Sequence, residues 1–228
     1  MPRVSSKSGM VPRGITGLLE LSRVSLVLFA FAAINLVVLF IDTLAPVDIS
    51  IEYRDGAFET VIRGSPSSLS LEIALSITSA AGFAIAVASY FPIALEVLMH
   101  ELGAETVFFR RLCIAAVISY LVSIASGIAG YILLATHLHE LAEVGIVTLG
   151  LFDTVIGGFV PITVGLLGDL FMALIFASMR RIFGENTLLL AAFLLILTNL
   201  YPNAYPLAWL VVFFSLRHTL RRVHSRPQ

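Results

Sequence analysis

Six apolar runs separated by short polar segments follow one another along the chain, and this alternation predicts most of its architecture. A helix needs about 20 apolar residues to cross a hydrocarbon layer roughly 30 Å thick. The first four runs meet that length and the last two are shorter. The runs occupy residues 22–45, 69–98, 112–135, 154–179, 186–200 and 207–216.

The sixth run reaches the far surface if its helix continues to Arg222 and the arginines extend toward the headgroups. The pattern therefore predicts an all-α integral membrane protein, a bundle of about six transmembrane helices. A re-entrant hairpin formed by residues 186–216 is the alternative. Prolines predict a bend within two of the spans, at Pro92 and at Pro161.

In the polar segment after the first run, apolar and polar residues alternate with the two-residue period of a β-strand. ISIEYRDGAFETVI, at residues 49–62, alternates apolar and polar positions around Asp55-Gly56, the dipeptide best suited to a type I′ turn. This predicts a small extracytoplasmic β-hairpin at residues 47–63. Its apolar face needs cover from the membrane surface, another loop or a partner. The expected register sets Ile49, Ile51 and Tyr53 opposite Ile62, Thr60 and Phe58.

The distribution of basic residues predicts the orientation. With six spans, twelve of the 14 lysines and arginines fall on the side of the termini, and only Arg54 and Arg63 fall on the other. Cytoplasmic loops carry such an excess. We therefore expect a protein of the cell membrane with a cytoplasmic segment 1–21, a membrane domain 22–222 and a cytoplasmic tail 223–228. The segment 137–151, on the opposite side, is semi-polar and fits a short amphipathic interfacial helix.

The amino-acid composition indicates which kinds of binding partner to expect. Only 13% of residues are charged, against about 25% in typical soluble domains. The single cysteine, Cys113, excludes an internal disulfide framework. The basic C-terminal segment suits anionic headgroups rather than nucleic acid. We expect the lipid bilayer as partner, together with other membrane subunits or self-association.

Asp169 is the strongest candidate for a functional residue. It precedes Arg180 by eleven residues, which places it about 16 Å from the charged end of its helix and near the midplane. Ionisable residues at that depth are expensive and mark ion or substrate pathways. We expect a polar path around Asp169 formed with Asn35, Glu72, Ser76, Ser79, Ser119 and Ser123. The alternative is a structural carboxyl group that holds helices together.

A second, weaker candidate lies in the polar segment after the third run. His137, His139, Glu140 and Glu143 have spacings that place several ligand-type side chains on one helical face, where they could hold zinc. Solvated loops often contain the same residues. No motif in the chain requires a cofactor.

Three short motifs partly resemble the intramembrane aspartyl proteases of the presenilin type. They are GLLGD at Gly165 to Asp169, Asp153 in FDT, and the later Pro206-Leu207-Ala208. That family pairs a YD aspartate with a GxGD aspartate and a later PAL. Here phenylalanine precedes Asp153, and the last motif is PLA. The two aspartates are sixteen residues apart, about 24 Å on one helix, whereas a catalytic pair shares a proton at about 3 Å.

The sequence therefore favours a transporter or channel-like subunit with no enzymatic activity. A non-catalytic subunit of a larger membrane complex is the first alternative, and an intramembrane aspartyl protease is the second.

Overall fold

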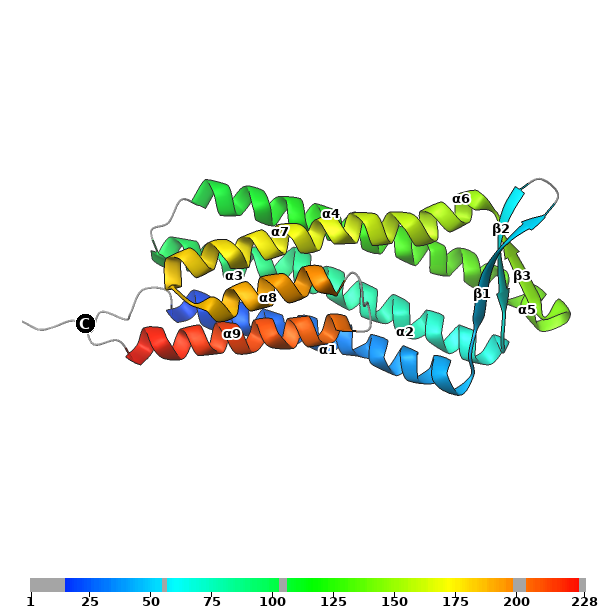
Figure 1. Cartoon of the computed structure of the whole chain (residues 1–228), viewed down its shortest axis with the longest axis horizontal. Coiled ribbons are helices and arrows are strands. Elements are labelled where there is room, and N and C mark those ends of the chain that lie inside the picture. The colour runs from blue at the N-terminus through cyan, green and yellow to red at the C-terminus, as the bar shows by residue number, and fades with distance from the viewer. Residues whose placement is uncertain (1–14, 55–56, 103–105, 199–203, 226–228) are drawn as a thin grey trace, which may run out of the picture.

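The computed structural model describes residues 15–54, 57–102, 106–198 and 204–225. Four helical segments in this part of the chain are long and apolar enough to cross a membrane, which is compatible with a multi-pass membrane protein. They lie side by side along the long axis of the molecule (Figure 1). In chain order they are α1 (Ile15–Leu44); α2 (Pro66–Ile85), η1 (Ala86–Tyr90) and α3 (Phe91–Leu102); α4 (Thr106–Thr136); and α6 (Leu151–Thr154), η2 (Val155–Phe159) and α7 (Val160–Phe183).

The last two apolar runs form a half-length hairpin instead of two further spans. Helix α8 (Asn186–Leu197) has 12 residues, which gives about 18 Å of length, too short to cross. Helix α9 (Tyr205–Ser225) returns beside it, and both lie along one half of the long helices (Figure 1). The expected six spans therefore reduce to four in the described residues, and the re-entrant alternative fits the structure.

Both prolines that predicted bends follow a π-helical turn. Turn η1 ends two residues before Pro92, and turn η2 ends two residues before Pro161. Proline lacks an N–H group, and its ring crowds the carbonyl oxygen four residues earlier. A π-turn accommodates this local break in the hydrogen-bond ladder. Each segment continues as a helix beyond its proline.

A three-stranded antiparallel sheet caps one end of the bundle, with the order β1 (Asp48–Arg54), β2 (Ala57–Arg63) and β3 (Ile146–Leu149). The expected hairpin register is confirmed, with Ile49 opposite Ile62 and Tyr53 opposite Phe58. The predicted type I′ turn lies outside the described residues. Of the segment 137–151 expected to form a short interfacial helix, only Leu138–Val144 is helical, as α5, and its position at a membrane interface stays a prediction. Helix α5 ends at Gly145, whose φ of 76° suits glycine, and the next four residues pair with β2 as β3.

The two faces of the sheet differ in polarity. On one face Arg63 pairs across the strands with Glu52, with 2.5 Å between Nη2 and Oε1. The hydrogen bond to Glu52 raises the pKa of Arg63 above its ordinary value. On the other face Ile62 and Val147 pack against Leu69 of α2, which joins the sheet to the end of the bundle.

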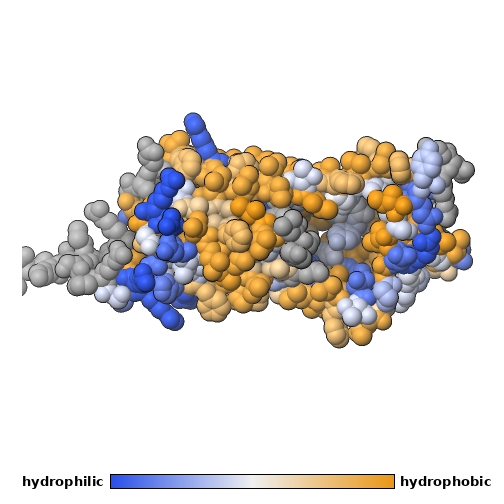
Figure 2. Space-filling model, viewed as in Figure 1, coloured by the Kyte–Doolittle hydropathy of each residue, from blue (hydrophilic) through white to orange (hydrophobic). Residues whose placement is uncertain are grey.

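The main core fills the half of the bundle that contains α8 and α9. Its largest fully buried side chains include Trp209, Phe91 and Phe176. The surface around this core is hydrophobic between two hydrophilic bands, one at each end of the long axis (Figure 2). Helix α1 begins and α9 ends at the same end of the bundle (Figure 1).

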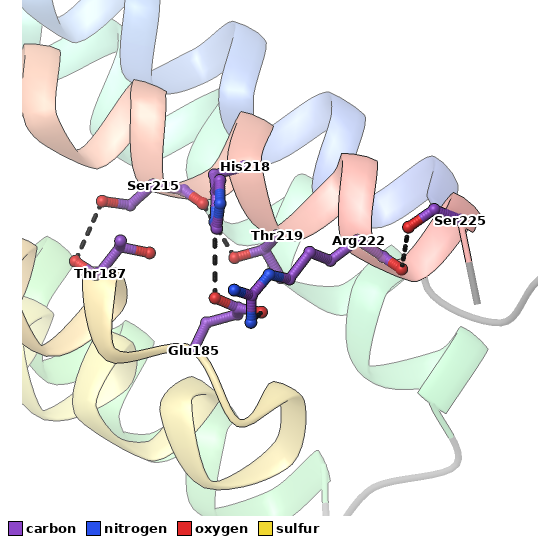
Figure 3. Close-up of polar contacts among 7 residues, drawn as sticks. All are labelled: Glu185, Thr187, Ser215, His218, Thr219, Arg222 and Ser225. Atoms are coloured by element: carbon purple, nitrogen blue, oxygen red, sulfur yellow. Dashed lines mark hydrogen bonds and ion pairs between the residues drawn. The ribbon is translucent and has the colours of Figure 1, made fainter.

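The base of the α8–α9 hairpin is joined by polar contacts (Figure 3). Glu185, whose side chain is only 4% exposed, lies 2.9 Å from Nη1 of Arg222 and 3.4 Å from Nδ1 of His218. Nearby, Ser215 donates a hydrogen bond to the carbonyl oxygen of Thr187. These contacts fix the two helices to each other at the end opposite the hairpin tip.

Candidate functional site

Helices α4 and α7 approach each other through a row of small residues, and this row determines where the site lies. At its closest point, a Cβ atom added to Gly130 would lie 2.5 Å from the Cα atom of Gly157. Small residues permit this close backbone approach. The facing pairs, from the sheet end inward, are Gly130 and Gly157, Gly127 and Pro161, Ser123 and Gly165, and Tyr120 and Gly168.

Asp169 follows directly after the last of these pairs. Its side chain is buried, with 4% of the residue exposed. The hydroxyl group of Tyr120 on α4 donates to Oδ1 of Asp169 at 2.5 Å, and the hydroxyl group of Tyr205 donates to the same atom at 3.1 Å. Tyr205 is the first residue of α9, so the start of this helix, at the inner end of the half-length hairpin, reaches the carboxylate. Both hydroxyl groups donate to the same carboxylate oxygen, so the side chain of Asp169 is held where α4, α7 and the start of α9 meet.

A cavity of about 380 Å³ lies beside Asp169, on the side toward the sheet end of the bundle; its lining is mainly apolar and includes several polar side chains. Five of the seven residues expected to form a polar path line it, namely Asp169, Asn35, Ser76, Ser79 and Ser123. They come from all four long helical segments, which the sequence alone could not bring together.

The other two expected path residues lie elsewhere. Ser119 is buried beside the cavity-lining face of α4 but does not line the cavity. Glu72 lies one helical turn beyond Ser76 on α2, nearer the sheet. Its Oε1 atom is buried and has no hydrogen-bond partner in the described structure.

Two of the cavity serines also connect helices. Ser79 on α2 donates to the carbonyl oxygen of Phe31 on α1, and Ser123 on α4 donates to the carbonyl oxygen of Pro161 on α7, both at 2.7 Å. Hydrogen bonds of this kind hold transmembrane helices together at modest energy. The cavity walls are therefore fixed by polar contacts as well as by packing.

The described lining of the cavity contains a carboxylate and no positively charged side chain. Among its described lining residues Asp169 is the only ionisable side chain apart from tyrosines, and no lysine, arginine or histidine lines it. An ionised carboxylate in such surroundings is costly unless a positive charge accompanies it. The arrangement can accept a proton, a metal cation or an ammonium group.

The aromatic lining was not anticipated from the sequence. Tyr120, Tyr131, Phe83 and Tyr205 all line the cavity. Tyr120 lies one turn from Ser123 in the interior of a span, and a polar aromatic residue at that depth was a usable signal. Tyr205 lies in the YPNAYP segment, which by itself predicts only a turn.

The candidate metal ligands are not brought together. No group of three or more His, Cys, Asp or Glu side chains suited to a metal ion occurs in the described ranges. Nδ1 of His137, the residue between α4 and α5, lies 2.9 Å from the carbonyl oxygen of Leu133 in the last turns of α4. His139 contacts Glu143 at 3.1 Å, and both side chains are largely exposed.

The protease-like pattern does not assemble a pair of aspartates. Asp153 and Asp169 lie on one uninterrupted helical segment, 151–183, so their sixteen-residue separation corresponds to about 24 Å. Tyr120 and Tyr205 donate hydrogen bonds to Asp169.

Comparisons with protein-family models, with curated proteins and with solved structures found no match to this chain.

Proposed function

We propose that the protein is a multi-pass membrane transporter or channel-like subunit that binds a cation at Asp169. The observation that carries the proposal is a buried carboxylate that lines a largely apolar cavity whose described lining contributes no positive charge. Two tyrosine hydroxyl groups stabilise the ionised carboxylate, and the bound cation would neutralise it.

The distribution of basic residues supports an orientation. A hairpin that enters and leaves on the same side keeps both termini together, just as two full spans would. Arg180, Arg181 and the arginines of α9 then lie on the cytoplasmic side, and Arg63 of the sheet lies outside. The cavity occupies the outer half of the bundle, and the apolar core fills the inner half.

The hairpin tip supplies a means of coupling. Because Tyr205 bonds directly to Asp169, neutralising that carboxylate weakens the contact that holds the tip in place. Cation binding and the position of the α8–α9 hairpin are then linked, as transport requires.

Flux measurements in proteoliposomes test the proposal. The probes are protons, K⁺, tetramethylammonium and dodecyltrimethylammonium, and the variant is Asp169→Asn. The matched control is Asp153→Asn, which removes the same charge from the outer end of the same helical segment. We expect at least one probe to be moved by the wild-type protein and by the control but not by Asp169→Asn. Absence of flux for every probe, or equal flux in both variants, would contradict it.

A non-catalytic subunit of a larger complex is the second candidate, and a specific groove favours it. Between α7 and α8 lies an apolar groove of about 580 Å³, lined by Leu174, Leu189 and Phe193 among others. Helix-in-groove contacts between membrane subunits need such a surface. Copurification of a stoichiometric membrane partner in mild detergent, combined with no flux, would favour this candidate.

A further inference from the structure

The cavity beside Asp169 opens through the side of the bundle. Figure 2 shows a hollow within the hydrophobic surface, between the two hydrophilic bands. Two residues that line the cavity are also strongly exposed, Asn35 on α1 and Ile162 on α7, the latter with 67% of its surface accessible. Beyond Ala32, helix α1 has no fully buried residue.

Apolar clusters occupy the bundle on both axial sides of the cavity. Toward the sheet, Ile73 and Leu141 pack with Ile62 and Val147. Toward the opposite end, Phe176 and Trp209 belong to the main core. If the hydrophobic band spans the bilayer, the side opening faces lipid, where a hydrated ion is strongly disfavoured.

The interior suits one particular kind of cation. Asp169 supplies the negative charge, and the rings of Tyr120, Tyr205 and Phe83 line the same cavity. Ammonium groups are attracted to aromatic faces as well as to carboxylates. At about 30 Å³ per water molecule, the 380 Å³ cavity has room for an ammonium headgroup but leaves a long hydrocarbon tail outside.

We propose that the ligand is an amphiphilic cation whose ammonium headgroup lies beside Asp169 while its hydrocarbon tail passes through the side opening into the lipid. The proposal rests on the proposed function, since it requires cation binding at Asp169. It adds the chemical class of the ligand and its route, from the bilayer rather than from water.

Trp209 provides a built-in reporter of binding. It is the only tryptophan of the chain, and its ring lies 5.8 Å from that of Phe83 and 6.4 Å from that of Tyr205, both of which line the cavity. Titrating protein in nanodiscs with dodecyltrimethylammonium or tetramethylammonium should change its fluorescence. The change should be lost in Asp169→Asn.

The test of the route places a covalently attached obstacle at the opening. Ile162→Cys, in a Cys113→Ala background, is titrated before and after reaction with N-cyclohexylmaleimide. The matched control is Ile118→Cys, a position on α4 that is 56% exposed and does not line the cavity. For each probe, the apparent affinity after the reaction is compared with that before it. Partitioning of the probe into the lipid is the same in both measurements and therefore does not affect the comparison.

We expect the adduct at position 162 to weaken dodecyltrimethylammonium binding about tenfold or more and to change tetramethylammonium binding less than about threefold. The adduct at position 118 should affect neither. Equal effects on both probes, or none, would overturn the side route while leaving cation binding intact. If neither probe changes Trp209 fluorescence in the wild-type protein, both the amphiphilic ligand and cation binding at Asp169 are overturned for ammonium ions. Proton and K⁺ flux still test the proposed function separately.

Discussion

The hydroxyl group of Tyr205 donates a hydrogen bond to Oδ1 of Asp169 across 36 positions of sequence, at a distance of 3.1 Å. One residue begins the returning helix of a half-length hairpin, and the other lies midway along a helical segment that is long enough to span a membrane. This contact places the hairpin tip at the floor of the cavity. It also makes the tip sensitive to the charge of the carboxylate.

Tyr205→Phe should loosen the tip without removing the carboxylate. Losing a hydrogen bond to a charged group costs about 1–2 kcal/mol of unfolding free energy, and the remaining bond from Tyr120 limits the loss. Titration with a denaturing detergent measures the difference. Tyr53→Phe is the control, because its side chain is exposed on the sheet and should change stability by less than about 0.5 kcal/mol. Equal stability of the two variants would remove the role assigned to Tyr205.

Gly157→Ala should separate α4 from the π-helical turn before α7. The new Cβ atom would lie 2.8 Å from the Cα atom of Gly130, and backbone cannot rotate aside as a side chain can. Such overpacking costs about 1–3 kcal/mol. The neighbouring change Gly158→Ala is the control, since its Cβ atom meets nothing within 4 Å. A thermal-shift assay in detergent compares them, and similar melting temperatures would show that the close approach is not required.

Arg222→Met should weaken the base of the hairpin. It leaves Glu185, a buried carboxylate, with His218 as its remaining described ionic partner. The expected loss is about 1–2 kcal/mol, below the cost of breaking a fully buried pair, because the Arg222 side chain is 57% exposed. In a double-mutant cycle, adding Glu185→Gln should recover part of this loss. Arg221→Met, which removes an exposed arginine of the same helix, should have little effect; an equal effect would argue for a general charge contribution.

The elements that follow from local pattern were predictable from the sequence. The register of β1 and β2 follows from period-two alternation around Asp55-Gly56, and the four long helices follow from the length of their apolar runs. Strand β3 was missed because IVTL is only four residues long and is stabilised by pairing with β2. Its local sequence did not distinguish it from the end of α5.

Only the polar residues of the candidate site, and not its aromatic residues, were predictable from the sequence. Asp169, Asn35 and three serines were identifiable because polar residues are rare within apolar runs. The partners of Asp169 were not, because Tyr205 approaches it only through the fold of the hairpin. The span count failed for a related reason: the short apolar run of α8 resembles a truncated span, and only the contact of Tyr205, at the start of α9, with Asp169 shows that the chain turns back halfway along the long helices.

The half-length hairpin gives the sharpest prediction about topology. If residues 186–216 crossed the membrane twice, Ala204 would lie on the outer surface with the sheet. In the structure, Ala204 directly precedes Tyr205 and lines a small apolar recess with Leu194 and Ala208. A membrane-impermeant maleimide added to intact cells should therefore label Glu59→Cys on β2 and leave Ala204→Cys unlabelled, both in the Cys113→Ala background. Arg221→Cys should be labelled only after permeabilisation, since α9 ends on the cytoplasmic side in the proposed orientation. Labelling of Ala204→Cys from outside would restore six full spans and remove the hairpin tip from the floor of the cavity.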